Sequence, residues 1–223
     1  MLYIALGFLL TLVAYLLAKP CNRLLPQIPV IIFATFIVLL LLTIVQWTYD
    51  DYMLEVNGLF NHLLGYVTVA LAIPLATMRY DDLSLKPIVG LIGFATLSAV
   101  ALPMGLAYLL HMSESTILAF ATRAVTTPIA LNIATLLDAP LGLATLIVIL
   151  SGVIGAAFSP LLLKNIHDER ATGLALGLAA HAIGTVQAWQ RGTIAGRYAA
   201  FGMAINGVVT AVWLPTFILW LQR

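Results

Sequence analysis

The sequence predicts an all-α membrane protein that crosses the bilayer several times. Of its 223 residues, 62% are hydrophobic and only 9% are charged, and the mean hydropathy is +1.07. A soluble domain carries about 25% charged residues because its surface faces water. The charges here are too few to cover such a surface, so lipid is the expected solvent.

Apolar stretches of about 20 residues, the length that spans ~30 Å of hydrocarbon, recur along the whole chain. Their connections are short, so residues 1–223 are predicted to form one integral membrane domain with about seven or eight transmembrane segments. The stretches cover residues 2–18, 29–46, 63–78, 88–110, 116–137, 140–163, 172–188 and 196–221.

Three of these stretches contain residues that interrupt a transmembrane helix. Pro74 lies in the third, Thr126, Thr127 and Pro128 in the fifth, and His181 in the seventh. Non-helical backbone inside a bilayer is tolerated where protein or a water-filled cavity covers it, as in transporter cores. The sequence therefore predicts a transporter-like core with broken or re-entrant helices. Pro74 is interpreted as a simple kink or as the counterpart of the second break in an inverted repeat.

The basic residues of the short loops predict how the fifth stretch is inserted. Lys19 and Arg23 place the first loop in the cytoplasm, because short cytoplasmic loops are enriched in Lys and Arg. The basic segment 164–170 then reaches the same side only if the fifth stretch enters and leaves on one side. We therefore expect a re-entrant hairpin there, although Arg191 and Arg197 fit this topology less well.

Arg123 is the most informative single residue. It lies about eight residues, or ~12 Å, into its apolar stretch. A central Arg costs roughly 2.5–3.5 kcal/mol on insertion scales. No Asp or Glu lies inside any apolar stretch, and Glu114 and Asp138 lie at the ends of this one. An unpaired cation in a transporter core complements an anionic solute. The alternative is that Arg123 reaches the interface or bonds to freed backbone carbonyls.

Thr126, Thr127 and Pro128 follow Arg123 directly and are candidate substrate-binding residues. Pro128 has no amide hydrogen and obstructs the carbonyl four residues earlier, so it frees backbone groups. The two Thr hydroxyls can bond to those groups or to a solute. An ordinary proline kink is the simpler interpretation.

His181 is a candidate for binding substrate and for coupling transport to a proton. Gly173, Gly177, His181 and Thr185 recur every four residues and would share one face of a helix. The glycines allow another helix to approach closely. An imidazole with an ordinary pKa near 6.5 can carry a proton. A buried histidine bonded across a helix pair explains the residue equally well, and Gly184 adds a second point where the helix can break.

Other polar and small residues recur at helical spacing. Ser151, Gly155 and Ser159 share one face, and Gly202, Asn206 and Thr210 share another. For these residues tight packing is the favoured role and solute contact the minority one. Asn206, together with Asn132 and Gly184, completes the candidate substrate-binding set: Arg123, Thr126, Thr127, Pro128, Asn132, His181, Gly184, Thr185 and Asn206.

Several functions find no support in the sequence. There is no G-x-x-x-x-G-K-[ST] phosphate loop, no cluster of His and Cys at metal-ligand spacing, and no nucleophile–base pair. No basic cluster is present to bind nucleic acid. We expect neither an enzyme nor a bound cofactor, and coupling to protons or sodium stays open.

Four segments of the chain resemble motifs of the LrgB/CidB family, in order and with compatible spacing over essentially the whole length. They are residues 123–130 (RAVTTPIA), 173–177 with 181–185 (GLALG and HAIGT), 69–75 (VALAIPL) and 151–156 (SGVIGA).

The resemblance implies two different functions in the bacterial inner membrane. Bacterial members are described as antiholin-like proteins that modulate murein hydrolases and lysis with a small holin-like partner of the LrgA/CidA type. A plastid member is a glycolate/glycerate translocator, and bacterial relatives are linked to uptake of pyruvate-like monocarboxylates. Because a lysis pore needs no cation and histidine at broken helices, the residues favour a secondary transporter, or its transport subunit, for small monocarboxylates. The sequence also leaves a homo-oligomer open.

The chain departs from the family pattern at a few positions. A Lys is common where Arg123 stands, an acid where Asn132 stands, a Ser where Ala180 stands and an Arg where Thr172 stands. Both Arg and Lys are cations, but only Arg offers a carboxylate a bidentate fork. These differences bear on substrate and coupling ion rather than on fold.

Overall fold

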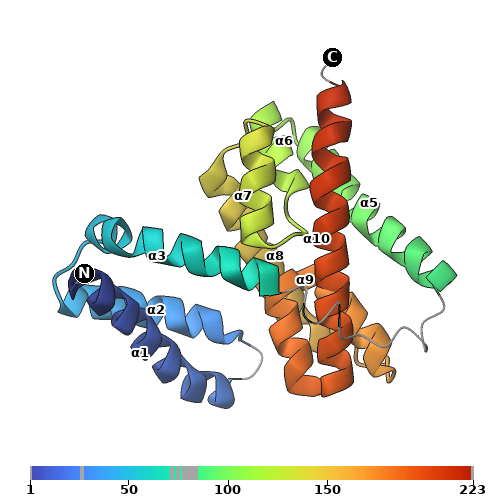
Figure 1. Cartoon of the computed structure of the whole chain (residues 1–223). Coiled ribbons are helices and arrows are strands. Elements are labelled where there is room, and N and C mark those ends of the chain that lie inside the picture. Colours follow the sequence, from blue (N-terminus) through green and yellow to red (C-terminus); the bar gives the residue numbers. More distant parts are fainter. Residues whose placement is uncertain (1, 26–27, 71–72, 74–75, 77–84, 222–223) are drawn as a thin grey trace. The chain divides into compact units, whose positions relative to one another are not determined.

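The structure is a computed structural model that describes residues 2–25, 28–70, 73, 76 and 85–221 (Figure 1). Within these residues the regular structure is entirely helical, and five helices are long and apolar enough to cross a membrane. The prediction of an all-α, multi-pass membrane protein is confirmed. The contacts divide the chain into two compact units, Met1–Ala70 and Leu71–Arg223, which are described separately. That residues 1–223 form one domain stays a prediction.

The first unit contains α1 (Leu2–Leu24), α2 (Val30–Ile44) and α3 (Tyr49–Ala70). The Thr11 hydroxyl of α1 lies 2.6 Å from the Tyr52 hydroxyl of α3 and holds these helices together. Asp50 and Asp51 lie in the first turn of α3, where the helix dipole favours negative charge. The third apolar stretch was predicted to begin at residue 63, and that start was wrong, because α3 begins at Tyr49.

The second unit holds every residue of the candidate site. Its helices in chain order are α5 (Leu85–Leu109), α6 (Glu114–Ala121), α7 (Thr127–Leu136), α8 (Leu141–Leu162), α9 (Glu169–Arg191) and α10 (Thr193–Leu221).

The fifth predicted stretch forms two short helices, α6 and α7, separated by a break at residues 122–126. With 8 and 10 residues they are about 12 and 15 Å long, so neither crosses a ~30 Å hydrocarbon core. The break lies halfway along the neighbouring helices. Arg123 bonds to Ala99 near the middle of α5, and Ala124 bonds to Asn206 near the middle of α10.

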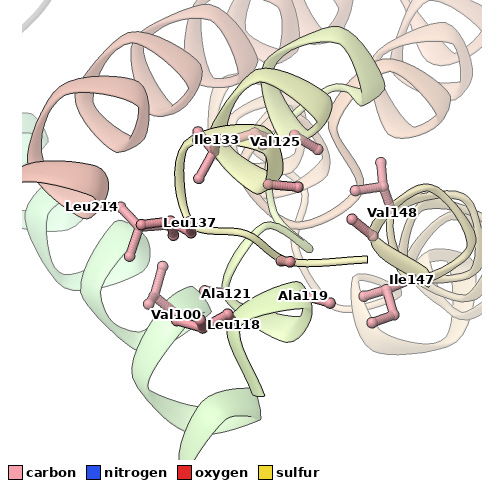
Figure 2. Packing of buried hydrophobic residues seen from close by; sticks show 14 of the residues in the cluster. Val100, Leu118, Ala119, Ala121, Val125, Ile133, Leu137, Ile147, Val148 and Leu214 are labelled. Carbon is pink, nitrogen blue, oxygen red and sulfur yellow. The ribbon is translucent and has the colours of Figure 1, made fainter. Parts of the chain in front are cut away.

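The outer ends of α6 and α7 lie together. One buried apolar cluster contains Leu118 of α6, Leu137 at the end of α7, Ala144 near the start of α8 and Ile218 near the end of α10, with Met104 of α5 packed against it. Figure 2 shows side chains of this cluster converging from helices far apart in the sequence. The α6–α7 pair therefore enters and leaves at one end of the unit, and the predicted re-entrant hairpin is confirmed.

The seventh predicted stretch, α9, is also a hairpin. His181 has φ 39° and ψ −124°, which no α-helix contains. Gly184 packs against the backbone of Leu176, although a straight helix would separate them by about 12 Å. A Cβ built on Gly192 would lie 3.0 Å from the Glu169 carboxylate at the opposite end of α9. Residues 182–191 thus run back along residues 169–180. The predicted interruption of this stretch at His181 is confirmed, and the structure shows that the chain reverses there.

The base of the α9 hairpin is capped by Asp168. Its carboxylate accepts a hydrogen bond from the backbone N–H of Arg170 at 2.8 Å. This bond and the adjacent Arg170 guanidinium hold the pKa of the Asp168 carboxyl below its ordinary value. The carboxylate is therefore charged at neutral pH and compensates the unpaired amides at the start of the helix.

The two hairpins enter the second unit from opposite ends. Thr96 of α5 bonds to Asn206 of α10, and both helices finish at the same end, so they run parallel. The intervening α8 starts at that end and runs back. Residues 85–136 and 141–191 are therefore each a spanning helix followed by a hairpin, in opposite orientations. This arrangement is the inverted repeat that the sequence left open.

Among the described residues, the counterpart of the first break is His181. The two breaks occupy equivalent places, because each is the tip of the hairpin that follows a spanning helix. The helix breaks at His181 itself, three residues before Gly184. Pro74 lies outside the described residues, so both of its interpretations, a kink and a counterpart of the break, stay predictions.

Candidate functional site

Both hairpin tips contact the same turn in the middle of α8. From the α6–α7 tip, Arg123 Nη1 donates to the Ser151 hydroxyl at 3.0 Å. From the α9 tip, His181 Nε2 lies 3.1 Å from the carbonyl oxygen of Val148. Val148 and Ser151 are three residues apart and share a helix face. The cation and the imidazole that were predicted separately from the sequence are thus brought to one place.

Arg123 is half-buried and is held by neutral acceptors. Besides Ser151, its Nε donates to the Ala99 carbonyl at 3.3 Å. Ala99 precedes Pro103 by four residues, and proline has no amide hydrogen, so this carbonyl lacks its usual helical partner. In the part of the chain that the structure describes, no carboxylate pairs with Arg123. The guanidinium has five donors, of which these two bonds use two.

The local sequence explains why the chain turns at this point. α6 ends at Ala121 and α7 begins at Thr127, with Thr126 extended at its N-cap position (ψ 152°). Pro128 lies in the first turn of α7, where a missing amide hydrogen costs nothing. The break is therefore at residues 122–126, and the prediction that Pro128 interrupts the helix was wrong, because it starts one.

The tip of the α6–α7 hairpin offers further hydrogen-bond donors. The Thr126 side chain is 7% exposed, and its buried hydroxyl has no hydrogen-bond partner among the described residues. The N-terminus of α7, with its positive helix dipole, begins beside it. Thr127 and Pro128 are half-buried in the same turn. A cation, an unpaired hydroxyl and a helix N-terminus together favour a negatively charged ligand.

Asn206 holds the break in place. Its Nδ2 donates to the Ala124 carbonyl at 2.7 Å, and its Oδ1 accepts from the Thr96 hydroxyl at 2.7 Å. Both ends of this buried amide are thus used within the protein, which gives Asn206 a structural role. Contact of Asn206 with a solute stays a prediction.

His181 is 3% exposed and occupies a backbone conformation that costs a non-glycine residue about 1–3 kcal/mol. The Val148 oxygen can only accept, so Nε2 carries a hydrogen in this bond. The hydroxyl of Thr185 donates to the backbone carbonyl of His181 at 2.8 Å. Strain of this kind is concentrated at functional sites, which supports a role for the imidazole beyond packing.

The predicted stripe of Gly173, Gly177, His181 and Thr185 is only partly correct. Gly173 and Gly177 pack against the backbone of α10, as the small residues suggested. His181 and Thr185 do not continue that face, because the helix reverses at His181. Gly184 is buried where the two arms of the α9 hairpin meet.

Asn132 stands apart from the other candidates. It is exposed on α7, one turn after Pro128, whereas Arg123 and His181 are directed to α8. Its contact with a solute stays a prediction. The residues that sequence reasoning missed are Ser151 as the partner of Arg123, Val148 as the partner of His181, and Pro103, whose position four residues after Ala99 was the available signal.

Gly152 provides the space that the His181 ring occupies. A Cβ at this position would lie 2.6 Å from His181 Cε1 and 2.9 Å from Ile183 Cδ1. We expect Gly152→Ala to displace the imidazole and to lower the free energy of unfolding by about 1–3 kcal/mol, measured by thermal unfolding in detergent. The control is Gly142→Ala on the same helix, where a Cβ would meet nothing within 4 Å. Equal melting temperatures for both variants would contradict this packing.

Comparison with known proteins agrees with this architecture. The model of the LrgB-like family matches residues 11–220. A Bacillus subtilis protein, YwbG, is 30% identical over 214 residues, which cover 92% of this chain and 93% of its own length. The holin-like protein CidB of Staphylococcus aureus is 28% identical over 222 residues, 96% of this chain and 95% of its own.

A protein of Haemophilus influenzae is 30% identical over 192 residues, 82% of this chain and 83% of its own length. No solved structure matches. The spanning helices and these bacterial relatives identify a multi-pass protein of the bacterial membrane. The family match covers all six helices that build the two hairpins and their contacts, and the chain belongs to the LrgB-like family.

Proposed function

We propose that this protein is a secondary transporter, or the transport subunit of one, for small monocarboxylates such as glycolate, glycerate or pyruvate. The observation that carries the proposal is Arg123. Its guanidinium lies at a hairpin tip between spanning helices, is held only by neutral acceptors among the described residues, and keeps donors free. An intramembrane cation in this state has its charge compensated when an anion binds.

The bound carboxylate would replace the neutral partners of Arg123 with a charge-assisted pair. The Thr126 hydroxyl and the N-terminus of α7 would bind the same anion. His181 would be the coupling group. Its partner Val148 lies one helical turn of α8 from Ser151, the partner of Arg123, so a proton on the imidazole adds a second positive charge beside the anion. Coupling by protons, or by sodium, belongs to this proposal. Neither a cofactor nor a catalytic step is needed for such a cycle.

The two hairpins would act as gates on opposite sides of the site. The α6–α7 hairpin enters from the end where α5 finishes, and the α9 hairpin enters from the other end. Inverted repeats of this kind allow transporters to expose one central site alternately to the two sides of a membrane. The shared turn of α8 would be the fixed platform between the two gates.

Side-specific labelling tests this arrangement. In a Cys21→Ser background, which removes the single native cysteine, Thr127→Cys and Ala182→Cys place a thiol at each hairpin tip. Ser113→Cys and Asp168→Cys are the references, because Ser113 precedes α6 and Asp168 precedes α9, at the bases of the two hairpins. A membrane-impermeant thiol reagent is expected to reach Thr127→Cys from the side on which Ser113→Cys reacts. It is expected to reach Ala182→Cys from the side on which Asp168→Cys reacts. Labelling of both tips from one side alone would contradict the opposed gates.

Uptake into proteoliposomes tests the function itself. The purified protein is expected to accumulate labelled glycolate or pyruvate, with unlabelled monocarboxylates competing. A protein that is folded, reconstituted and inactive towards every monocarboxylate would remove the transport proposal.

A second candidate function is regulation of lysis together with a small LrgA/CidA-type membrane protein. It is favoured by the holin-like name of the Staphylococcus relatives. Gly173 and Gly177, where the sequence predicted the close approach of another helix, are buried against α10 of the same chain. A partner, or a second copy of this protein, would therefore bind another surface. Co-purification with such a partner, and lysis that is unaffected by changes at Arg123 and His181, would support regulation over transport.

A further inference from the structure

Ser151 differs from Thr145 and Ser159, two other hydroxyl residues of α8. Within a helix, Ser and Thr commonly donate to a carbonyl three or four residues earlier. On α8 itself, Thr145 donates to Leu141 at 2.9 Å and Ser159 to Ala156 at 3.0 Å. Ser151 Oγ instead accepts a hydrogen bond from Arg123 Nη1. Among the described residues, the Ser151 hydroxyl donates to no acceptor. Its hydroxyl hydrogen is available to a ligand.

Ser151 also lies beside the guanidinium that would bind the ligand. Arg123 Nη1 donates to Ser151 Oγ at 3.0 Å, so an anion bound to Arg123 would lie close to the Ser151 hydroxyl. Arg123 belongs to a hairpin tip and Ser151 to the α8 turn that the His181 tip also contacts. Ser151 as a whole is half-buried.

We propose that Ser151 is a substrate-contact residue of the carboxylate site, and the inference rests on the transport function proposed above. The hydroxyl oxygen accepts from Arg123 and orients the guanidinium, and the hydroxyl hydrogen is donated to an oxygen of the bound carboxylate. Because a hydroxyl both donates and accepts, one side chain performs both tasks. The carboxylate would then be bound from the α6–α7 hairpin tip by Arg123 and Thr126, and from α8 by Ser151.

The alternative for Ser151 is a purely structural anchor for Arg123, whose loss would lower the melting temperature in detergent together with uptake, so both are measured. Ser151→Ala removes the hydroxyl donor and the acceptor of Arg123. We expect an unchanged melting temperature and a roughly tenfold rise in the KM for labelled glycolate or pyruvate, as for the loss of a hydrogen bond to a charged group. The maximal rate should change less than about twofold, because Arg123 is still present. Ser151→Thr keeps the hydroxyl and should restore KM to within about threefold of the native value.

Ser159→Ala is the matched control. It removes a hydroxyl from the same helix, where Ser159 bonds to Gln187 and Ala156 rather than to the site. Its KM should equal that of the native protein. Suppose that the native protein takes up monocarboxylates, so that the transport proposal holds. An unchanged KM in Ser151→Ala, or a rise in KM that Ser151→Thr fails to reverse, would then overturn the assignment of Ser151 alone. A native protein without uptake would instead overturn the transport proposal, and this assignment with it.

Discussion

Arg123→Ala is expected to lower monocarboxylate uptake at least about 30-fold. Removing one partner of a buried, hydrogen-bonded charge pair costs about 2 kcal/mol or more, which corresponds to that factor. In this protein the loss falls on the bound state, because free Arg123 contacts only the Ala99 carbonyl and the Ser151 hydroxyl among the described residues. Initial uptake rates of labelled glycolate and pyruvate in proteoliposomes measure the effect.

Two further variants separate the charge of Arg123 from its packing. Arg123→Gln keeps a polar side chain that can donate to Ala99 or Ser151, so it should preserve the melting temperature but not uptake. Arg123→Lys keeps the charge and should retain part of the uptake at a raised KM, since an ammonium lacks the bidentate fork. Equal uptake by the native protein and Arg123→Ala would remove Arg123 from the mechanism. Full activity of Arg123→Gln would show that packing, rather than charge, is what the site requires.

The first hairpin could be predicted from the sequence, whereas for the second the sequence predicted only the interruption at His181 and not the reversal of the chain. Composition gave the membrane class, and the polar break at Thr126 together with the basic loops gave the re-entrant topology. The α9 hairpin depends on one residue, His181, in a positive-φ conformation that four-residue spacing does not reveal. A signal was present in Arg191 and Arg197, which fit poorly beside a continuous span. Once α9 folds back, both lie at the end where the basic segment 164–170 lies, as the positive-inside rule expects.

The candidate site shows the same limit. Arg123, Thr126 and His181 were predicted because an ionisable or polar group within an apolar stretch is unusual by itself. Their partners were not predicted, because Ser151 and Val148 look like ordinary packing residues until the fold brings two hairpin tips to one turn of α8. Asn132 was included for its position after Pro128, yet it lies on the exposed face of α7. Which face a polar residue occupies depends on tertiary contacts that spacing alone cannot give.

The second large effect is expected at Gly177, where the α9 hairpin packs against α10. A Cβ at Gly177 would collide with the backbone carbonyl of Ala199, and one at Gly173 with the carbonyl of Ala195. The two contacts are four residues apart on each helix, so residues 169–180 and α10 run parallel with their backbones in contact. Backbone atoms within a helix cannot rotate away as a side chain can, and the only relief is to move the helices apart.

Gly177→Ala is therefore expected to lower the free energy of unfolding by about 1–3 kcal/mol, and Gly177→Leu to lower it further. When Gly173 is replaced together with Gly177, we expect no folded protein. Thermal unfolding and size-exclusion chromatography in detergent measure both. Gly105→Ala on α5 is the control, because a Cβ there would meet nothing within 4 Å. A Gly177→Leu protein that melts like the control would mean that the α9 hairpin does not rest on α10. In that case His181 would have no rigid support beside Val148, and the shared turn of α8 could not serve both gates.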